Sequence, residues 1–112
     1  MTLPTAKARA LRESWDAQQD YLVDRREERF ETLVDLLEVA VPSRATILDL
    51  GCGTGSLTER ILTRLPGARV VALDHDPVLL TIGSVGLRTG ADRVAWVDAD
   101  LRGAGWTRSL PA

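Results

Sequence analysis

Three glycines stand at alternate positions in the middle of the chain and are the residues best suited to hold a ligand. Gly51, Gly53 and Gly55 follow an acidic residue, Asp49, and enclose the small residue Cys52. Glycine allows a backbone to approach a ligand closely because it has no Cβ atom. A helix that begins after such a loop attracts a negatively charged group to its N-terminus. The loop therefore predicts a ligand site, in which Cys52 packs rather than reacts; the alternative is a tight turn without a ligand.

Acidic residues also follow two other short apolar segments. Asp74 closes the second segment, and Asp98 and Asp100 follow the third. Ligands of parallel sheets bind at the carboxyl ends of the strands, so we expect these acids to share one edge with the glycine loop. A carboxylate at Asp74 can accept hydrogen bonds from two ribose hydroxyls. A helix cap or a solvated acid is the other reading of Asp74.

The elements that position these residues alternate between strands and helices. Short apolar segments rich in branched residues predict three buried strands, at residues 45–50, 69–73 and 94–97. A helix is predicted from the capping-box pair Ser56 and Glu59 to about residue 65. Another is predicted from the cap Asp76 to Gly90. This order predicts an α/β protein with a parallel sheet and right-handed crossovers.

The N-terminal region is predicted to be helical and the C-terminal tail to be a loop. Periodic apolar residues indicate helices at 6–16 and 21–40, and Pro42 ends this region. The chain thus divides into a helical lead-in, residues 1–43, and a ligand-binding part, residues 44–112. We expect Trp96 to lie in the core, whereas Trp15 and Trp106 can be core or ligand-facing.

Composition is typical of one soluble globular domain. The chain has 112 residues, of which 45% are hydrophobic and 27% charged, and its net charge is −2. This balance does not indicate nucleic-acid binding, and no apolar run approaches the roughly 20 residues that span a membrane. Cys52 is the only cysteine, so we expect no disulfide and no metal site, and a cytoplasmic location.

The stretch Ile47-Leu48-Asp49-Leu50-Gly51-Cys52-Gly53-Thr54-Gly55 resembles the first motif of the class I methyltransferases. The resemblance extends over residues 21–101, about the first half of such a domain. It implies a Rossmann-like three-layer fold and S-adenosyl-L-methionine as cofactor. The residues that it implies for cofactor binding are Asp49, Gly51, Cys52, Gly53, Gly55, Asp74, His75, Asp100 and Leu101.

The resemblance also implies roles for the later residues of this set. Asp100 corresponds to the acid that accepts a hydrogen bond from the adenine amino group, and the backbone N–H of Leu101 faces the ring. Asp98 competes with Asp100 for this role. His75 is expected to cover the adenine face, or else to be a solvent-exposed histidine.

The loop favours a methyl donor over a nicotinamide dinucleotide. The dinucleotide fingerprint is G-x-G-x-x-G, and Ser56 stands where its last glycine would fall. Asp49 suits the cationic amino group of a methionine and would repel a pyrophosphate. A nicotinamide-binding half remains the weaker alternative.

The chain supplies only the first three strands of such a fold. The strand that lies against the first one in the family is missing, so the first strand is expected to expose an unpaired edge. The chain is then a fragment, or it pairs with itself or with another chain. We expect a methyltransferase acting on a small molecule, without an identifiable catalytic base; a non-catalytic cofactor-binding or assembly module is the alternative. Arg25, Arg26 and Arg29 lie on a surface helix or hold the methionine carboxylate.

Overall fold

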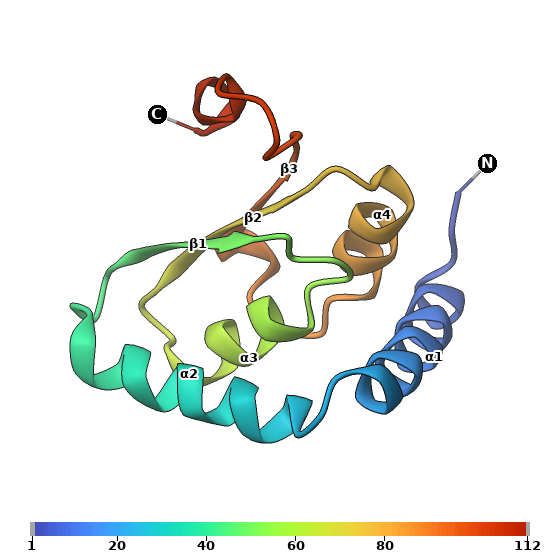
Figure 1. The fold of residues 1–112 in the computed structure, drawn as a ribbon, viewed down its shortest axis with the longest axis horizontal. Coiled ribbons are helices and arrows are strands. Elements are labelled where there is room, and N and C mark those ends of the chain that lie inside the picture. The colour runs from blue at the N-terminus through green and yellow to red at the C-terminus, as the bar shows by residue number, and fades with distance from the viewer. Residues whose placement is uncertain (1, 112) are drawn as a thin grey trace.

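A three-stranded parallel sheet forms the centre of the protein in a computed structural model that describes residues 2–111 (Figure 1). Its strands lie in the order β1-β2-β3. They are β1 (Thr46–Leu50), β2 (Arg69–Asp74) and β3 (Val94–Asp98). The α-helices are α1 (Thr5–Leu22), α2 (Arg26–Ala40), α3 (Ser56–Arg64) and α4 (Pro77–Gly86), and the short 3₁₀-helices are η1 (Ala91–Arg93) and η2 (Trp106–Ser109). The predicted α/β class and parallel sheet are confirmed.

The strand register places the three carboxyl ends at one level. Leu50 at the end of β1 pairs with Leu73 of β2. Asp74 and Asp98, the last residues of β2 and β3, pair with each other. The predicted strand ends are therefore correct to within one residue, and the residues that follow them meet at one edge of the sheet.

The two faces of the sheet are covered differently. Helices α2, α3 and α4 cover one face, and the main core between them and β2 contains Val34, Ile61, Leu62, Val70, Ala72 and Leu80. On the other face, Trp106 and Leu110 of the C-terminal segment pack against a smaller cluster that includes Leu73. Figure 1 shows this segment, in red, on the side of the sheet away from the helices. The tail is mostly irregular, as predicted, but it contains the short helix η2, and these two side chains anchor it to the sheet.

The N-terminal helices differ from the prediction in where they break. Helix α1 is longer than expected and packs along α4, with Ala8 fully buried. Helix α2 packs on α3 instead, so one straight helix from residue 21 to residue 40 cannot satisfy both contacts. The chain turns before α2 at Arg25, whose φ of 54° is left-handed.

The helix ends also test the predicted caps. The Asp76 side chain accepts hydrogen bonds from Val78 N and Leu79 N, as expected of a cap. The capping box at Ser56 and Glu59 was wrong, because α3 begins after Gly55 without a side-chain cap. Both side chains bind α1 instead, where Ser56 donates to Asp16 and Glu59 accepts from Arg12.

Helix α4 ends at Gly86, earlier than the predicted end at Gly90. Gly90 has a left-handed φ of 73° and precedes the short helix η1. Trp96 is half-buried against the main core, as predicted. None of the described helices is long and apolar enough to cross a membrane.

Strand β1 forms an open edge of the sheet. Its only neighbour among the described strands is β2. Leu48 and Leu50 keep 42% and 48% of their surface exposed. Leu33 and Leu36 of α2 are exposed beside them and line an apolar pocket together with Leu48. The expected unpaired edge is therefore present.

Candidate functional site

The glycine loop is fastened to the end of the second strand. The backbone N–H groups of Gly51 and Cys52 both donate to the carbonyl oxygen of Leu73, at 2.8 and 2.9 Å. Gly51, Gly53 and Gly55 all have left-handed φ values, of 72°, 57° and 81°. Side chains other than hydrogen are unfavourable in this conformation, so the alternating glycines are a requirement of the loop's shape.

The space above and below the loop differs from one glycine to the next. A Cβ atom on Gly51 would meet nothing within 4 Å, so this position opens onto free space. A Cβ atom on Gly55 would lie 2.5 Å from the Trp96 ring. Gly51 thus borders open space, whereas Gly55 lets the loop rest on the Trp96 ring.

Asp74 joins the loop to the second strand. Its Oδ2 accepts a hydrogen bond from the backbone N–H of Gly53 at 2.8 Å, and its Oδ1 accepts from Asp76 N at 3.0 Å. Each carboxylate oxygen retains a lone pair for a further donor. The carboxylate is half-buried, so it is held in place and remains accessible.

The third strand end lies next to Asp74. Ala99 N donates to the carbonyl oxygen of Asp74 at 3.0 Å. His75 bridges the two candidate acids, with Nδ1 3.3 Å from Asp98 Oδ1 and Nε2 3.9 Å from Asp100 Oδ2. The His75 side chain is 61% exposed. The structure therefore brings Gly53, Asp74 and Asp100 to one edge.

Asp100 is held by its own neighbour. The guanidinium of Arg102 donates to both carboxylate oxygens, with contacts of 2.7 to 3.1 Å, and Arg102 N donates to Oδ1 at 2.9 Å. These hydrogen bonds hold the pKa of Asp100 well below its usual range. Asp100 lies just past β3, as predicted, and Leu101 follows it at the exposed rim.

The other two predicted residues of the loop lie inward. Asp49 is 8% exposed, and its Oδ2 accepts a hydrogen bond from Thr58 Oγ1 at 2.6 Å. Burial raises the pKa of Asp49 in spite of the hydrogen bonds from Thr58. Cys52 packs in the main core, where burial raises the pKa of its thiol to about 12. A thiol with this pKa stays neutral, which agrees with a packing role.

Helices α1 and α2 close a pocket over the loop. It has a volume of about 310 Å³, and its lining includes Trp15, Gln19, Arg26, Gly51 and Gly53. The indole Nε1 of Trp15 lies 3.8 Å from the position that a Cβ atom on Gly53 would take. Sequence reasoning missed Gln19 and left Trp15 open, because nothing local indicates that α1 folds back over a loop nearly forty residues away.

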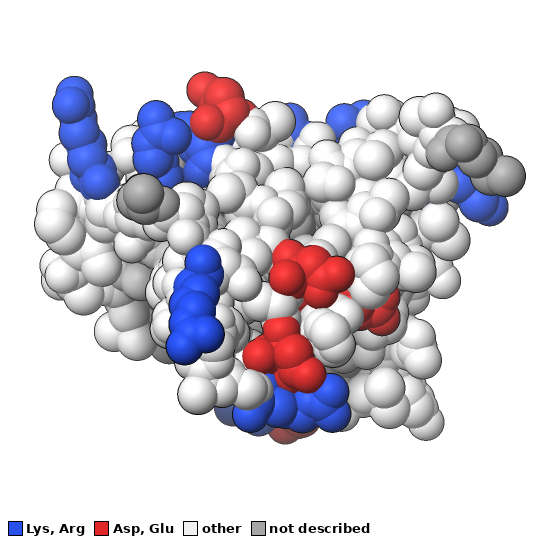
Figure 2. Space-filling model, turned by 90° about the horizontal axis from the view of Figure 1, so that it is seen from above, with Lys and Arg blue, Asp and Glu red and all other residues white. Residues whose placement is uncertain are grey.

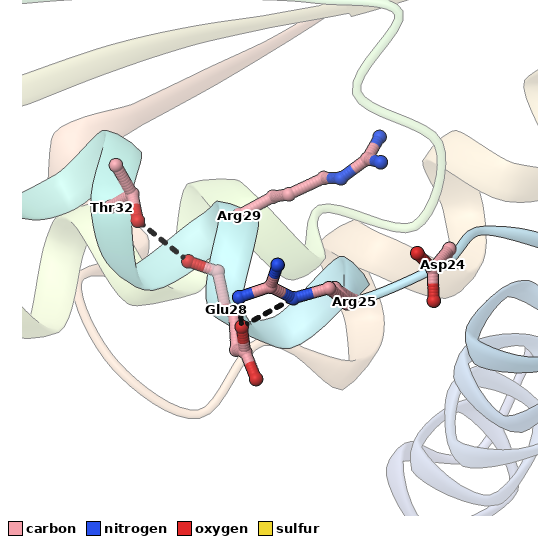
Figure 3. A pocket seen from close by; sticks show the side chains of 5 residues that line it. All are labelled: Asp24, Arg25, Glu28, Arg29 and Thr32. Atoms are coloured by element: carbon pink, nitrogen blue, oxygen red, sulfur yellow. Dashed lines mark hydrogen bonds and ion pairs between the residues drawn. The ribbon is translucent and has the colours of Figure 1, made fainter.

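The arginines of the lead-in fall into two groups. Arg26 lines the glycine-loop pocket, but it is paired with Asp16 at 3.1 Å and Asp20 at 3.0 Å and stacks on Phe30. Arg25 and Arg29 line a separate pocket on α2 with Asp24, Glu28 and Thr32 (Figure 3).

This second pocket contains none of the sheet-edge residues. Arg25 pairs with Glu28 of the same helix turn. Arg29 extends away from that pair, as Figure 3 shows, and forms no ion pair with any residue from 2 to 111. The two pockets therefore share no lining residue.

The charges of the site do not indicate a metal or a basic surface. Within the described part of the chain, no three His, Cys, Asp or Glu side chains are grouped to hold a metal ion. On the face shown in Figure 2, acidic side chains gather near the middle, and the basic ones do not merge into one field.

Comparison with known families identifies the chain. Residues 47–108, which include the glycine loop and all three strand ends, match the family described as "Methyltransferase domain". The chain belongs to this methyltransferase family. The match begins inside β1 and leaves the helices α1 and α2 outside it.

Individual relatives cover different shares of the chain. It is 38% identical over 99 residues to trans-aconitate 2-methyltransferase of Azoarcus sp. (strain BH72), an alignment covering 88% of this chain and 36% of the relative. It is 42% identical over 73 residues to ribosomal RNA small subunit methyltransferase H of Mycobacterium avium (strain 104), covering 60% of this chain and 19% of the relative. The chain thus spans little more than a third of the length of the first relative.

A solved structure shares the fold. The TehB-like SAM-dependent methyltransferase from Corynebacterium glutamicum superimposes with a TM-score of 0.55 at 25% sequence identity. The alignment covers 86% of this chain and 46% of that chain. The Rossmann-like assignment of the sheet and its helices is therefore confirmed.

Proposed function

We propose that the chain binds S-adenosyl-L-methionine and forms the cofactor-binding part of a methyltransferase. One observation carries this proposal. The Gly53 N–H donates to Asp74, and His75, the residue after Asp74, has its Nε2 atom 3.9 Å from Asp100 Oδ2. A glycine loop and two acids at neighbouring strand ends make one continuous surface, which suits a nucleoside joined to an amino acid.

The acidic side of this surface suits the nucleoside. Asp74 accepts from the ribose hydroxyls with the lone pairs that Gly53 and Asp76 leave free. The exposed ring of His75 covers one face of the adenine, and Asp100 with the backbone N–H of Leu101 recognises its edge. Asp98 is the competing acid, but it ends β3 and contacts the other nitrogen of His75.

The pocket side suits the amino-acid end. Gly51 borders open space there, and α3 begins just behind it. The hydroxyl of Thr54 lines this pocket, is buried, and has no hydrogen-bond partner among the described residues. A buried hydroxyl without a partner costs free energy, and a bound polar group relieves that cost. The negative charge of Asp49 below the loop favours an ammonium group.

The chemistry requires orientation more than acid–base help. When bound, the cofactor supplies a methyl group that its sulfonium charge has already activated. The loop, Asp74 and the pocket fix the position of that group relative to an acceptor, which lowers the entropy cost of an in-line displacement. We assign no catalytic base to this chain.

We propose that the chain divides into a helical lead-in, residues 1–43, and a ligand-binding part, residues 44–112.

We propose a small molecule as the methyl acceptor. The relative that covers 88% of the chain is named for trans-aconitate, whereas the relative named for ribosomal RNA covers 60%. The wider alignment favours the first kind of acceptor. We also propose that the protein acts in the cytoplasm, where Cys52 stays reduced; fractionation of cells that express a tagged chain tests this.

A non-catalytic assembly role is the second candidate, favoured by the exposed β1 edge. In this form, Leu48 and Leu50 are covered by a second copy or by a partner chain. Light scattering over a range of concentrations tests self-pairing. A mass that stays monomeric at high concentration contradicts it.

Titration calorimetry with S-adenosylhomocysteine and with NAD, side by side, tests the proposed cofactor. We expect saturable binding of the first and no binding of the second. Binding of NAD alone, or of neither ligand, would overturn the proposal. Methylation is then assayed with the chain joined to the remaining part of a relative, because the chain spans 36% of that relative's length.

A further inference from the structure

Two polar side chains of helix α1 line the pocket over the glycine loop. Trp15 and Gln19 lie one turn apart on α1, and both line the pocket. Neither side chain forms a hydrogen bond with a residue from 2 to 111, although both are half-buried. Residues four positions apart share one face of a helix, so both donors lie on the side of α1 that borders the pocket.

The cations around this pocket are already neutralised. Arg26 is paired with Asp16 and Asp20, and its side chain is only 10% exposed. Arg12 forms a two-pronged ion pair with Glu59, at 2.7 and 3.1 Å. Breaking such half-buried pairs leaves charges without partners, at a cost that a ligand carboxylate must first repay. No arginine of this pocket is therefore free to bind an anion.

We propose that Trp15 and Gln19 bind the amino-acid end of the cofactor through uncharged donors, with the indole N–H of Trp15 donating to its carboxylate. The inference rests on the proposed function and adds the residues that distinguish this cofactor from a bare nucleoside. The Trp15 Nε1 atom lies 3.8 Å from the position that a Cβ atom on Gly53 would take, and the backbone N–H of Gly53 is held by Asp74. A hydrogen bond to a charged group is strong enough there to replace an ion pair.

The position of Trp15 is fixed by contacts between α1 and α3. Asp16, the residue after Trp15, accepts a hydrogen bond from Ser56 Oγ in the first turn of α3. Arg12, one turn earlier, is tied to the same helix through Glu59. Helix α1 is thereby held against α3 on both sides of Trp15, so the indole keeps its position over the loop before a ligand arrives.

The test compares two probes that differ only in the end recognised by the pocket. S-adenosylhomocysteine carries the amino acid, and 5′-methylthioadenosine lacks it. Trp15→Phe keeps an aromatic ring but removes the N–H donor. We expect the affinity of the complete chain for S-adenosylhomocysteine to fall about tenfold, as for the loss of one charged hydrogen bond. The affinity for 5′-methylthioadenosine stays within about twofold of the original.

Matched variants separate recognition from folding. Trp106→Phe makes the same change on the opposite face of the sheet, and Gln18→Leu changes an exposed neighbour of Gln19. We expect neither variant to alter the ratio of the affinity for S-adenosylhomocysteine to the affinity for 5′-methylthioadenosine. Gln19→Leu lowers this ratio about threefold, as for a neutral hydrogen bond. Gln19→Leu also decides the question if Trp15→Phe fails to fold.

Three results would overturn the inference. Equal weakening of both probes by Trp15→Phe would show that the ring only packs. Unchanged affinities in both Trp15→Phe and Gln19→Leu would remove the two residues from the site. If the unmodified chain binds neither probe, the proposed function itself is wrong and the inference is lost with it.

Discussion

The two sides of the glycine loop differ in the exposure and charge of their polar side chains. On the Asp74 side, the side chains of His75, Asp98 and Asp100 are exposed or half-exposed and face solvent. On the α1 side, Arg26 is paired, Asp49 is a buried acid that accepts from Thr58, and the remaining polar groups, Trp15, Gln19 and Thr54, are neutral. One loop thus separates an open acidic surface from a more enclosed pocket, and a ligand that crosses it must match both.

The difference has a physical origin in solvent access. A carboxylate at the open sheet edge keeps part of its hydration and costs little to maintain. An unpaired guanidinium under α1 and α2 would lose that hydration, so Arg26 is paired with Asp16 and Asp20, whereas the buried Asp49 is held by a hydrogen bond from Thr58. The comparison predicts that variants on the Asp74 side affect every adenosine ligand, whereas variants on the α1 side affect only ligands with an amino-acid end.

The largest effect is expected at Asp74. Asp74→Ala removes the acceptor for the ribose and also the partner of the Gly53 N–H, held at 2.8 Å. Affinity for S-adenosylhomocysteine and for 5′-methylthioadenosine falls tenfold or more, and by the same factor. Calorimetry with both ligands checks this. Unchanged affinity would remove Asp74 from the site, and a loss confined to one ligand would contradict the division of the loop.

A second large effect is expected at Gly83, beneath the glycine loop. Gly83 of α4 lies beneath the loop, and a Cβ atom there would come within 2.7 Å of the Thr54 carbonyl oxygen and 2.8 Å of the Trp96 ring. Gly83→Ala therefore destabilises the fold by about 1–3 kcal/mol, although alanine favours helix. Urea unfolding measures the change.

Gly86 in the same helix provides the control. The nearest atoms to a Cβ on Gly86 are 3.4 Å away, in the backbone of α1. Gly86→Ala changes stability by less than about 1 kcal/mol. Equal losses for the two variants would show that helix conformation, and not contact with the loop, explains the glycines.

These two glycines mark a limit of the sequence prediction. Alternation of strands and helices gave the parallel sheet, and the position of strand ends gave the edge that Gly53, Asp74 and Asp100 share. Those features depend on local pattern. The packing of Trp96 under the loop depends on which helix crosses which strand, so the spacing of residues along the chain does not explain Gly83.

The predicted capping box of α3 shows the same limit of the sequence prediction. Ser56 and Glu59 have the spacing of a local motif, yet both bind α1, some forty residues earlier. Long-range ion pairs and hydrogen bonds took precedence over a local cap worth about 1 kcal/mol. The pocket of Trp15 and Gln19 arises from those same contacts, and for that reason it was not predictable from spacing.

A moderate effect is expected at the adenine end. Asp100→Ala lowers affinity for S-adenosylhomocysteine about fivefold, because the acceptor for the adenine amino group is lost from a partly exposed position. The variant also loses preference over the inosine counterpart, which has no amino group. Asp98→Ala is the matched control, and a larger effect there would exchange the roles of the two acids.

The smallest effect is expected at Asp49, where burial has raised the pKa. A carboxyl with a raised folded pKa binds its proton more tightly when folded, so its contribution to stability is present at low pH and lost as pH rises through that pKa. Asp49→Asn has no carboxyl group to ionise, so this loss of stability does not occur. Its amide oxygen can still accept from Thr58 Oγ1, which lies 2.6 Å from Asp49 Oδ2 in the original chain. The variant melts a few degrees higher than the original chain at pH 7, and the difference disappears below the usual carboxyl range.

The same substitution sharpens the division of the loop. Asp49→Asn removes the negative charge beneath the ammonium group, so affinity falls about threefold for S-adenosylhomocysteine and not for 5′-methylthioadenosine. Asp92→Asn, at an exposed acid of η1, changes neither stability nor affinity. If the buried carboxylate of Asp49 serves ligand binding, the Asp49→Asn variant is more stable at pH 7 and binds S-adenosylhomocysteine more weakly. Loss of stability at pH 7 would show instead that Asp49 serves the fold through Thr58.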